Sequence, residues 1–329
     1  MSLNVRHISY GANVTADYIT KLRTGEIKSL KTSFSKLNKA LLNGIDWNRI
    51  FTIAALSGGG KSTILEQIKR DFLDLNGDSF EILSFDFEML IEDQLTRYVS
   101  SKIKKSLKDI YSSDKPLSDE DYKEVVDILE ARKNAPVFYV DNPGTPEQIR
   151  ATILQFAMER DLLSLNKGLV ISIDHATLVK GKSGETEKTI IDELMTVFLE
   201  LKKYFASTGL RCIFLVLSQL NRDIERPERT SNPLLHFPTR NDIFAASSIY
   251  HCSDYVMISH RPANVNGIKD YYGPPQGEKF PRGLPIKSPA DPKRDMVYWH
   301  LIKERFGKTV IIPMVEDFKN ATLEQINLV

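Results

Sequence analysis

A glycine-rich turn near residue 58 constrains this chain more than any other stretch. An apolar run at residues 51–55 enters the turn, and a segment with helical character leaves it at residue 62. Strand, turn and helix N-terminus form a cradle for phosphate, because closely wrapped N–H groups and the helix dipole point at the same anion. The spacing matches G-x-x-x-x-G-K-[ST], with Ala55 at the first glycine. The predicted nucleotide contacts are Ser57, Gly58, Gly59, Gly60, Lys61, Ser62 and Thr63.

Two side chains of this turn have expected roles of their own. Lys61 would reach the β- and γ-phosphates of a nucleoside triphosphate, and the Ser62 hydroxyl would be a ligand of the accompanying Mg²⁺. Such a site also needs an acid that supports the metal ion, usually at the end of a later apolar strand. Asp174 directly follows the apolar residues 170–173. The sequence therefore predicts ATP and Mg²⁺ as cofactors, with Ser62 and Asp174 as the residues that bind or support the metal ion.

The composition limits the partners and the compartment of the chain. The 329 residues carry a formal net charge of +1, so a nucleic-acid surface would have to be a local patch. Cys212 and Cys252 are the only cysteines, which argues against a disulfide framework and favours the cytoplasm. No apolar run reaches the length of a membrane span and no signal peptide opens the chain, so we expect no membrane association.

Apolar strands alternate with helical segments along the chain, which predicts an α/β fold with a mainly parallel central sheet flanked by helices. A closing hairpin is expected from 297–303 and 309–313. Residues 262–292 hold seven of the fifteen prolines, so we expect no strand or helix there. The expected strands are 50–55, 79–89, 137–140, 170–173, 212–217 and 254–259, and the expected helices are 62–75, 91–109, 118–133 and 145–163, with another after 187.

The N-terminal residues show one short apolar stripe. Residues 1–14 carry no periodicity and are expected to form an arm. Tyr18, Ile19 and Leu22 form the stripe, and Gly25 would end any helix. The sequence leaves open whether the stripe packs on its own domain or docks on a neighbouring subunit.

Two carboxylates lie near the end of the second expected strand, at 79–89. Ser84, Asp86 and Glu88 share one face by the strand period of two. Hydrolysis needs a base that orients the attacking water, and a carboxylate beside the phosphate cradle can supply it. Glu88 is the first candidate and Asp86 the second.

Two later segments hold further candidates. Gln219 follows the expected strand at 212–217 and could sense the γ-phosphate by hydrogen bonding. Lys303 and Arg305 would lie on one face of a strand. The residues alone leave open a solvated pair or a pair that meets a phosphate presented by another subunit.

Taken together, these motifs resemble the motor domain of DnaB-like replicative helicases. The resemblance rests on residues 55–62, Phe87-Glu88-Met89, Ile173-Asp174, residues 218–222 and Lys303-Glu304-Arg305. It implies a RecA-like P-loop ATPase that assembles as a hexameric ring on single-stranded DNA. By position, Glu88 would activate water, and Gln219 would couple the γ-phosphate to DNA loops. Lys303 and Arg305 would act in trans, on the nucleotide site of the neighbouring subunit, with Arg305 as the arginine finger.

The chain departs from the family at several places. Residues 242–253 match the DNA-contacting loop, but Phe244-Ala245-Ala246-Ser247 replaces the family's Arg-Glu-Ser-Gly, and His175 replaces a tyrosine. Backbone N–H groups, Arg222 or Arg240 would then grip phosphates. The expected DNA contacts are Arg222, Arg240, Phe244 and Ser247.

The resemblance also implies a division of the chain. It predicts an arm and linker helix at 1–41, a motor domain at 42–320 with an inserted proline-rich loop at 262–292, and a tail at 321–329. By this division, we expect no counterpart of the family's N-terminal helical domain, which recruits primase. This short format suggests a phage or mobile-element version in a bacterial host cytoplasm, with a primase or a loader as a possible partner.

Two functions remain open from the sequence. The first is an ATP-driven DNA helicase or translocase that hydrolyses ATP at the subunit interfaces of a ring. The second is a RecA-like ATPase that acts as a loader, recombinase or switch without unwinding. Glu88 and Arg305 favour the first, and the missing loop arginine favours the second.

Overall fold

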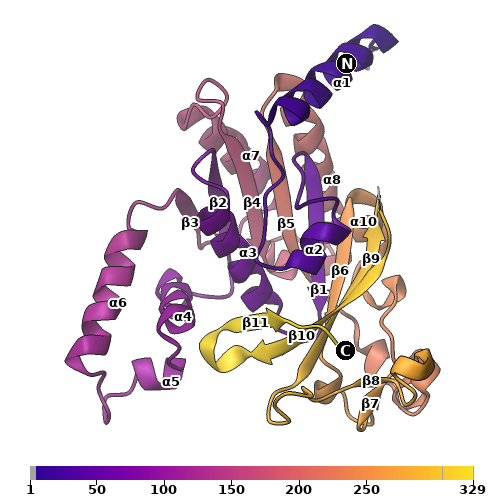
Figure 1. The fold of residues 1–329 in the computed structure, drawn as a ribbon. Coiled ribbons are helices and arrows are strands. Elements are labelled where there is room, and N and C mark those ends of the chain that lie inside the picture. Colours follow the sequence, from indigo (N-terminus) through magenta and orange to yellow (C-terminus); the bar gives the residue numbers. More distant parts are fainter. Residues whose placement is uncertain (1–4, 306, 329) are drawn as a thin grey trace.

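The protein is described here by a computed structural model that covers residues 5–305 and 307–328. These residues form a central nine-stranded sheet with helices on both faces (Figure 1). The strand order is β11-β10-β9-β6-β1-β5-β4-β2-β3. The strands are β1 (Arg49–Ala55), β2 (Phe80–Asp86), β3 (Val137–Val140), β4 (Gly168–Asp174), β5 (Cys212–Gln219), β6 (Tyr255–His260), β9 (Met296–Glu304), β10 (Val310–Asp317) and β11 (Thr322–Gln325).

Strand direction divides the sheet into two parts. β3, β2, β4, β5, β1 and β6 run parallel to one another, and β9, β10 and β11 continue from β6 as an antiparallel edge. The parallel strands are almost entirely apolar and buried, as strands covered on both faces must be. The predicted α/β fold with a mainly parallel sheet is therefore confirmed.

Successive strand residues alternate between two hydrophobic cores on opposite faces of the sheet. The first core contains Ile171 and Phe214 and is covered by helices α7, α8 and α10. The second contains Val170 and Leu215 and is covered by α2 and α3. The covering helices are α7 (Pro146–Glu159), α8 (Glu187–Thr208), α10 (Ala246–Cys252), α2 (Ser35–Ala40) and α3 (Lys61–Leu75).

Three helices between β2 and β3 lie beyond the β3 edge of the sheet, on the left of Figure 1. They are α4 (Ile91–Ile103), α5 (Leu107–Ile110) and α6 (Asp119–Arg132). The single helix expected at 91–109 is wrong. Lys104 has a φ of 55°, which ends α4, and the Ser106 side chain caps a new helix.

The first helix begins earlier in the chain than the sequence predicts. Helix α1 (Ile8–Thr24) includes much of the expected arm, and Gly25 ends it with a φ of 74° as predicted. None of the residues of α1, all of them described, is buried. In contrast, Ile27, Leu30 and Leu41 are buried in the second core. The domain boundary expected at residue 42 therefore lies within a packed segment.

The proline-rich segment is folded onto the sheet. Val265, Ile268 and Tyr272 form a third core with Tyr298 of β9. β7 (Tyr271–Tyr272) and β8 (Leu284–Pro285) pair with each other, so the expectation of no strand at 262–292 is wrong. Pro285 is tolerated because it ends a two-residue strand, where no ladder N–H is required.

The expected tail at 321–329 is also wrong in part, because Thr322–Gln325 forms β11. Leu323 is buried in the second core, and Gln67 of α3 hydrogen bonds to both of its backbone groups. Among the helices in the described part of the chain, none has the length and apolar character needed to cross a membrane.

Candidate nucleotide-binding and hydrolysis site

The glycine-rich turn joins the carboxyl end of β1 to the N-terminus of α3 at the edge of the sheet where parallel strands end. Gly58 and Gly60 have φ values of 72° and 80°, a backbone region that residues with a Cβ adopt at a cost. Gly60 is the N-cap of α3, and the first turn of α3 holds no acidic residue. The positive end of the helix dipole therefore faces the turn without a competing carboxylate.

Three residues from distant parts of the chain hold this turn, and the sequence analysis missed all of them. The Ser259 hydroxyl donates to the Gly59 carbonyl at 3.0 Å, and the Asn264 amide donates to the Gly58 carbonyl at 3.2 Å. The ring of Phe318 occupies the space beside Gly60, with its Cζ 2.5 Å from where a Cβ would stand. No local pattern marks these residues, because they lie about 200 positions or more further along the chain.

Lys61, Ser62 and Asp174 lie together next to the turn. Burial raises the pKa of Asp174, but the close contact and charge of His175 and the nearby Ser62 hydroxyl outweigh burial and hold the pKa below its usual value. Burial lowers the pKa of Lys61, while the charges of Asp174 and Glu88 act in the opposite direction. A partly desolvated lysine between carboxylates is well suited to bind an incoming phosphate.

Glu88 lies beyond β2, which ends at Asp86 and not at residue 89 as expected. The Glu88 side chain is 54% exposed, and its Oε2 lies 2.7 Å from Nδ1 of His175. The same Nδ1 lies 2.6 Å from Oδ1 of Asp174. Nδ1 of His175 therefore lies close to both carboxylates, and the exposed Glu88 remains open to a water molecule.

Asp86 has a different environment, since it is buried and pairs in register with Asp174 of β4. Its nearest cation is Lys69 of α3, whose Nζ lies 3.8 Å from Oδ2 and also contacts the Ser84 hydroxyl at 2.7 Å. Neither carboxylate oxygen of Asp86 has a hydrogen bond to any residue that the structure describes. Asp86 is thus less accessible to water than Glu88.

The oxygen ligands at this place suit a magnesium ion. A hydroxyl from Ser62 and a carboxylate from Asp174 are hard donors of the kind Mg²⁺ prefers, and they lie within hydrogen-bonding reach of each other. The buried oxygens of Asp86, with no hydrogen bond of their own in the described residues, could orient a metal-bound water. The residues therefore fit the ion that accompanies a nucleoside triphosphate.

Gln219 lies beside the first residue of the phosphate cradle, because β5 pairs Gln219 with Ala55. The Gln219 carbonyl accepts the N–H of Phe244 at 2.9 Å, and the Ala55 carbonyl accepts the N–H of Leu220 at 3.1 Å. The Gln219 side chain is exposed. One short backbone path thus connects the cradle to the loop around residue 244.

The expected DNA contacts lie in the turns between β5 and α10 and, for Ser247, in the first turn of α10. Arg222 begins a 3₁₀ turn (Arg222–Glu225), Arg240 begins another (Arg240–Asp242), and Asn221 hydrogen bonds across to the second turn. Arg222, Arg240 and Ser247 are exposed, whereas Phe244 is half-buried against the first core. Their contact with DNA stays a prediction.

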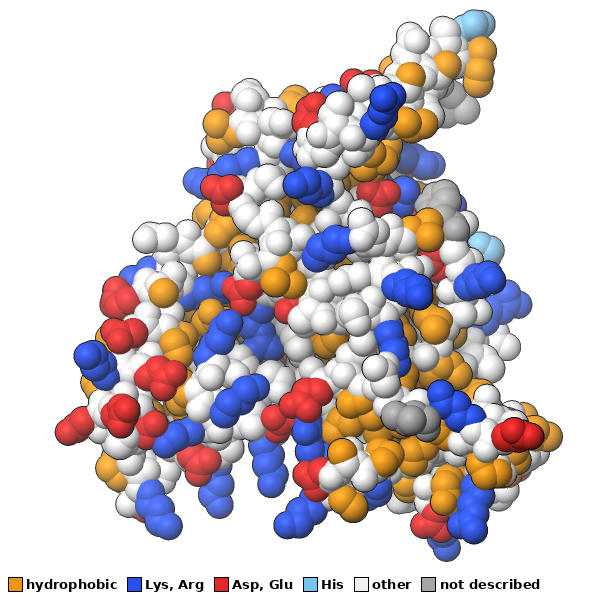
Figure 2. Space-filling model, viewed as in Figure 1, with side chains coloured by type: hydrophobic (Ala, Val, Ile, Leu, Met, Phe, Trp, Pro, Cys, Tyr) orange, Lys and Arg blue, Asp and Glu red, His pale blue; other side chains and the backbone are white. Residues whose placement is uncertain are grey.

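The charge distribution agrees with a near-neutral chain. Positive and negative side chains are interspersed over the face in Figure 2, and acidic residues gather over α6. On this face, the described residues show no continuous basic field. A DNA contact would therefore depend on individual turns.

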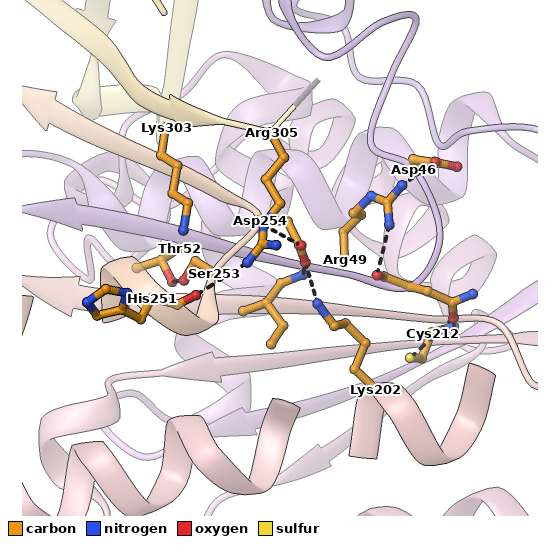
Figure 3. A network of polar contacts seen from close by, with 12 residues as sticks. Asp46, Arg49, Thr52, Lys202, Cys212, His251, Ser253, Asp254, Lys303 and Arg305 are labelled. Carbon is orange, nitrogen blue, oxygen red and sulfur yellow. Dashed lines mark hydrogen bonds and ion pairs between the residues drawn. The ribbon is translucent and has the colours of Figure 1, made fainter. Parts of the chain in front are cut away.

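Lys303 and Arg305 lie at the opposite edge of the sheet from the phosphate cradle. Arg305 Nε is 3.2 Å from Oδ1 of Asp254, and the other oxygen of Asp254 accepts the N–H of Ile50 at the start of β1 (Figure 3). Because a strand rises about 3.3 Å per residue, Ile50 and Ala55 are separated by about 17 Å. Arg305 therefore points away from the cradle of its own chain.

Comparisons with known proteins agree on the family and the fold. A family model described as the DnaB-like helicase C terminal domain matches residues 29–320. A solved structure described as an ATPase domain is similar in fold, with a TM-score of 0.73 at 16% identity, over 98% of this chain and 100% of that chain. A DnaB-like replicative helicase solved with attention to its interactions with primase gives a TM-score of 0.70 at 15% identity, over 94% of this chain and 67% of that chain. No curated protein sequence matches.

Proposed function

Because the chain belongs to the family of DnaB-like helicase C-terminal domains, we propose that it hydrolyses ATP with the residues gathered around the turn at 57–63 and uses the energy to move on single-stranded DNA. The family membership makes the chain an ATP-dependent helicase motor with a RecA-like fold. The alternative of a loader, recombinase or switch is not favoured. The roles of individual residues, the metal ion, the ring and the DNA contacts are the content of the proposal.

The observation that carries the proposal is the meeting of Lys61, Glu88 and Asp174 at one end of the sheet. These residues come from three separate segments, and each is of the type that phosphoryl transfer requires at its place. Lys61 and the N–H groups of the turn bind the phosphates. Glu88 orients the attacking water and accepts its proton, because it is the exposed carboxylate of the cluster.

The metal side of the site is formed by Ser62 and Asp174. These two residues would hold Mg²⁺, which would supply positive charge against the phosphates. Ser62 supplies its hydroxyl, and Asp174 accepts hydrogen bonds from groups around the ion. Phe318 and Arg261, which lies 5.3 Å over the Phe318 ring, border the turn and limit the space beside Gly60.

Arg305 and Lys303 act on the nucleotide of a neighbouring subunit. Their position far from their own cradle supports a trans role, since a cation about 17 Å away cannot reach the same γ-phosphate. Within the apolar stripe of α1, Tyr18 packs against the second core and donates to Asp46 at 2.8 Å. Other apolar side chains of α1 have no cover and support an oligomer. Ile8, Val14 and Ile19 are exposed on a helix that projects from the domain (Figures 1 and 2). We assign these three exposed side chains to contact with a neighbouring subunit in a ring of six.

Single-stranded DNA is the substrate along which the ring moves. Arg222 and Arg240 are exposed on adjacent turns, and the segment that holds both is closed by a hydrogen bond from the Phe244 N–H to the Gln219 carbonyl. A change at the γ-phosphate that shifts Gln219 would therefore shift these turns. This connection supports coupling between hydrolysis and DNA movement.

The proposal is tested by Glu88→Gln, with Glu92→Gln as a matched control on the exposed first turn of α4. Removing the base should lower kcat by about 100-fold or more while nucleotide affinity stays within a few-fold. ATPase rates with and without single-stranded DNA, and nucleotide titrations, measure both quantities. Normal turnover in Glu88→Gln, or loss of nucleotide binding, would contradict the assignment. The control should behave as the wild type.

A further inference from the structure

Asp254 is a buried carboxylate with three partners, at the start of β6. Its Oδ2 accepts the Ile50 N–H at 2.9 Å and lies 2.8 Å from Nζ of Lys202, which comes from α8. Its Oδ1 faces Arg305 Nε at 3.2 Å. Figure 3 shows Arg305 and Lys202 reaching Asp254 from different elements.

We propose that Asp254 is a positioning residue that orients the Arg305 guanidinium toward the nucleotide of the neighbouring subunit. This inference rests on the proposed trans role of Arg305. A finger acts on charge that develops in the transition state, so its geometry must be set before the reaction. The side chain of Arg305 has several rotatable bonds and is 45% exposed, so packing alone does not fix it.

Asp254 can do this because it is itself immobile. Its side chain is 5% exposed, and Oδ2 is held by a backbone N–H at the start of β1 and by Lys202. The neighbouring Ser253 is also held, since its hydroxyl hydrogen bonds to Thr52 of β1 at 2.7 Å. Oδ1 therefore presents a fixed acceptor to Arg305.

The contacts occupy only part of the guanidinium. Nε faces Asp254, and Nη2 donates to the His251 carbonyl at 3.4 Å. A guanidinium has five N–H donors, so donors remain for phosphate oxygens. The exposed side of the Arg305 guanidinium is the side that a neighbouring subunit would meet.

The local charge stays positive, which suits a phosphate partner. Lys202 already compensates the charge of Asp254, so Arg305 is not neutralised by it. Lys303 lies beside Arg305 and donates to the carbonyl of Tyr250. Tyr250 directly precedes His251, whose carbonyl accepts from Arg305. Burial, followed by the charge of Arg305, lowers the pKa of Lys303.

The first test is the kinetics of Asp254→Asn in the assembled protein. Loss of the oriented contact should lower kcat about 10-fold or more and leave KM within about twofold, because misplacing a catalytic group costs rate and not substrate binding. Asp254→Glu keeps the charge for Lys202 and moves the carboxylate by one methylene, so it should fold and show a smaller fall in kcat. Wild-type kcat in both variants would overturn the inference.

Mixing subunits separates positioning from a general structural effect. In equal mixtures of Asp254→Asn and Lys61→Ala, about a quarter of the ring interfaces pair an intact phosphate cradle with an intact finger. Activity should therefore recover. Asp254→Asn mixed with Arg305→Ala should not recover, because both defects lie on the finger side. Absence of recovery in the first mixture, or recovery in the second, would overturn the inference.

A third mixture distinguishes failure of the trans role of Arg305 from failure of the positioning role of Asp254. Arg305→Ala with Lys61→Ala should also recover activity if Arg305 acts in trans. Failure of this mixture in verified mixed rings would overturn the trans finger itself. Recovery here without recovery for Asp254→Asn with Lys61→Ala would reject only the positioning role.

Discussion

Lowering the pH from 7.5 to 5 should destabilise the protein through two buried histidines. Burial lowers the pKa of His260 and of His300 to about 3, against an ordinary value near 6.5. Between these values the unfolded chain binds protons that the folded chain does not. Stability is therefore complete above about pH 6.5 and falls as the pH decreases toward 3. Each imidazole should cost about 2 kcal/mol at pH 5, and the pair about 4 kcal/mol.

The structure explains why these rings resist protonation. His260 ends β6, and its ring centroid lies 5.1 Å from that of Tyr272 in the third core. The Tyr272 hydroxyl lies 3.1 Å from Nε2 of His300. Asp242 works in the opposite direction on His260, but Arg229 and His236 offset it. Charge on either ring would be buried among aromatic side chains.

Urea unfolding of the nucleotide-free protein at fixed protein concentration measures this dependence. His260→Leu is the matched variant, because neither nitrogen of His260 hydrogen bonds to any described residue. It should halve the loss between pH 7.5 and 5, to about 2 kcal/mol. Carboxylates titrate mostly below this window. A wild-type loss under about 1 kcal/mol, or an unchanged pH dependence in His260→Leu, would refute the reasoning.

Two further predictions concern the nucleotide and DNA contacts. Gly60→Ala should abolish nucleotide binding in a titration, because a Cβ at Gly60 would meet the Phe318 ring. The control Gly77→Ala has a similar φ of 72° and open space around the new Cβ, so it should bind nucleotide normally. Equal binding by both variants would be incompatible with the cradle geometry. Arg222→Ala with Arg240→Ala should reduce the slope of log affinity for single-stranded DNA against log salt by about 1.4, at about 0.7 per phosphate contact. Arg150→Ala, on the exposed side of α7, is the control, and an unchanged slope in the double variant would exclude these arginines.

Local sequence patterns predicted which end of the sheet gathers the turn and the acidic residues, whose catalytic roles stay a prediction. The turn at 57–63, Asp174 and Glu88 each follow an apolar run, and parallel strands bring such ends to one edge. The strand at 137–140 has the predicted bounds for the same reason, since a short apolar run is its complete signal. These features depend on neighbours in sequence.

Contacts between distant segments were not predictable from the same patterns. Ser259, Asn264 and Phe318 hold the turn from far along the chain, and their residue types occur in many other positions. β11 holds only one apolar side chain, Leu323, which gives no periodicity to detect. Asp254 resembles any acid at the start of a strand until Arg305 and Lys202 are seen to meet it.

ATP-driven unwinding of a forked DNA duplex tests the central claim most directly. The wild-type protein should separate the strands with ATP and Mg²⁺, and should fail with a non-hydrolysable ATP analogue. Glu88→Gln should bind the fork and the nucleotide but leave the duplex intact, because the motor lacks only the base for hydrolysis. Strand separation by Glu88→Gln at the wild-type rate, or a wild-type protein that hydrolyses ATP on DNA without separating the strands, would contradict the account.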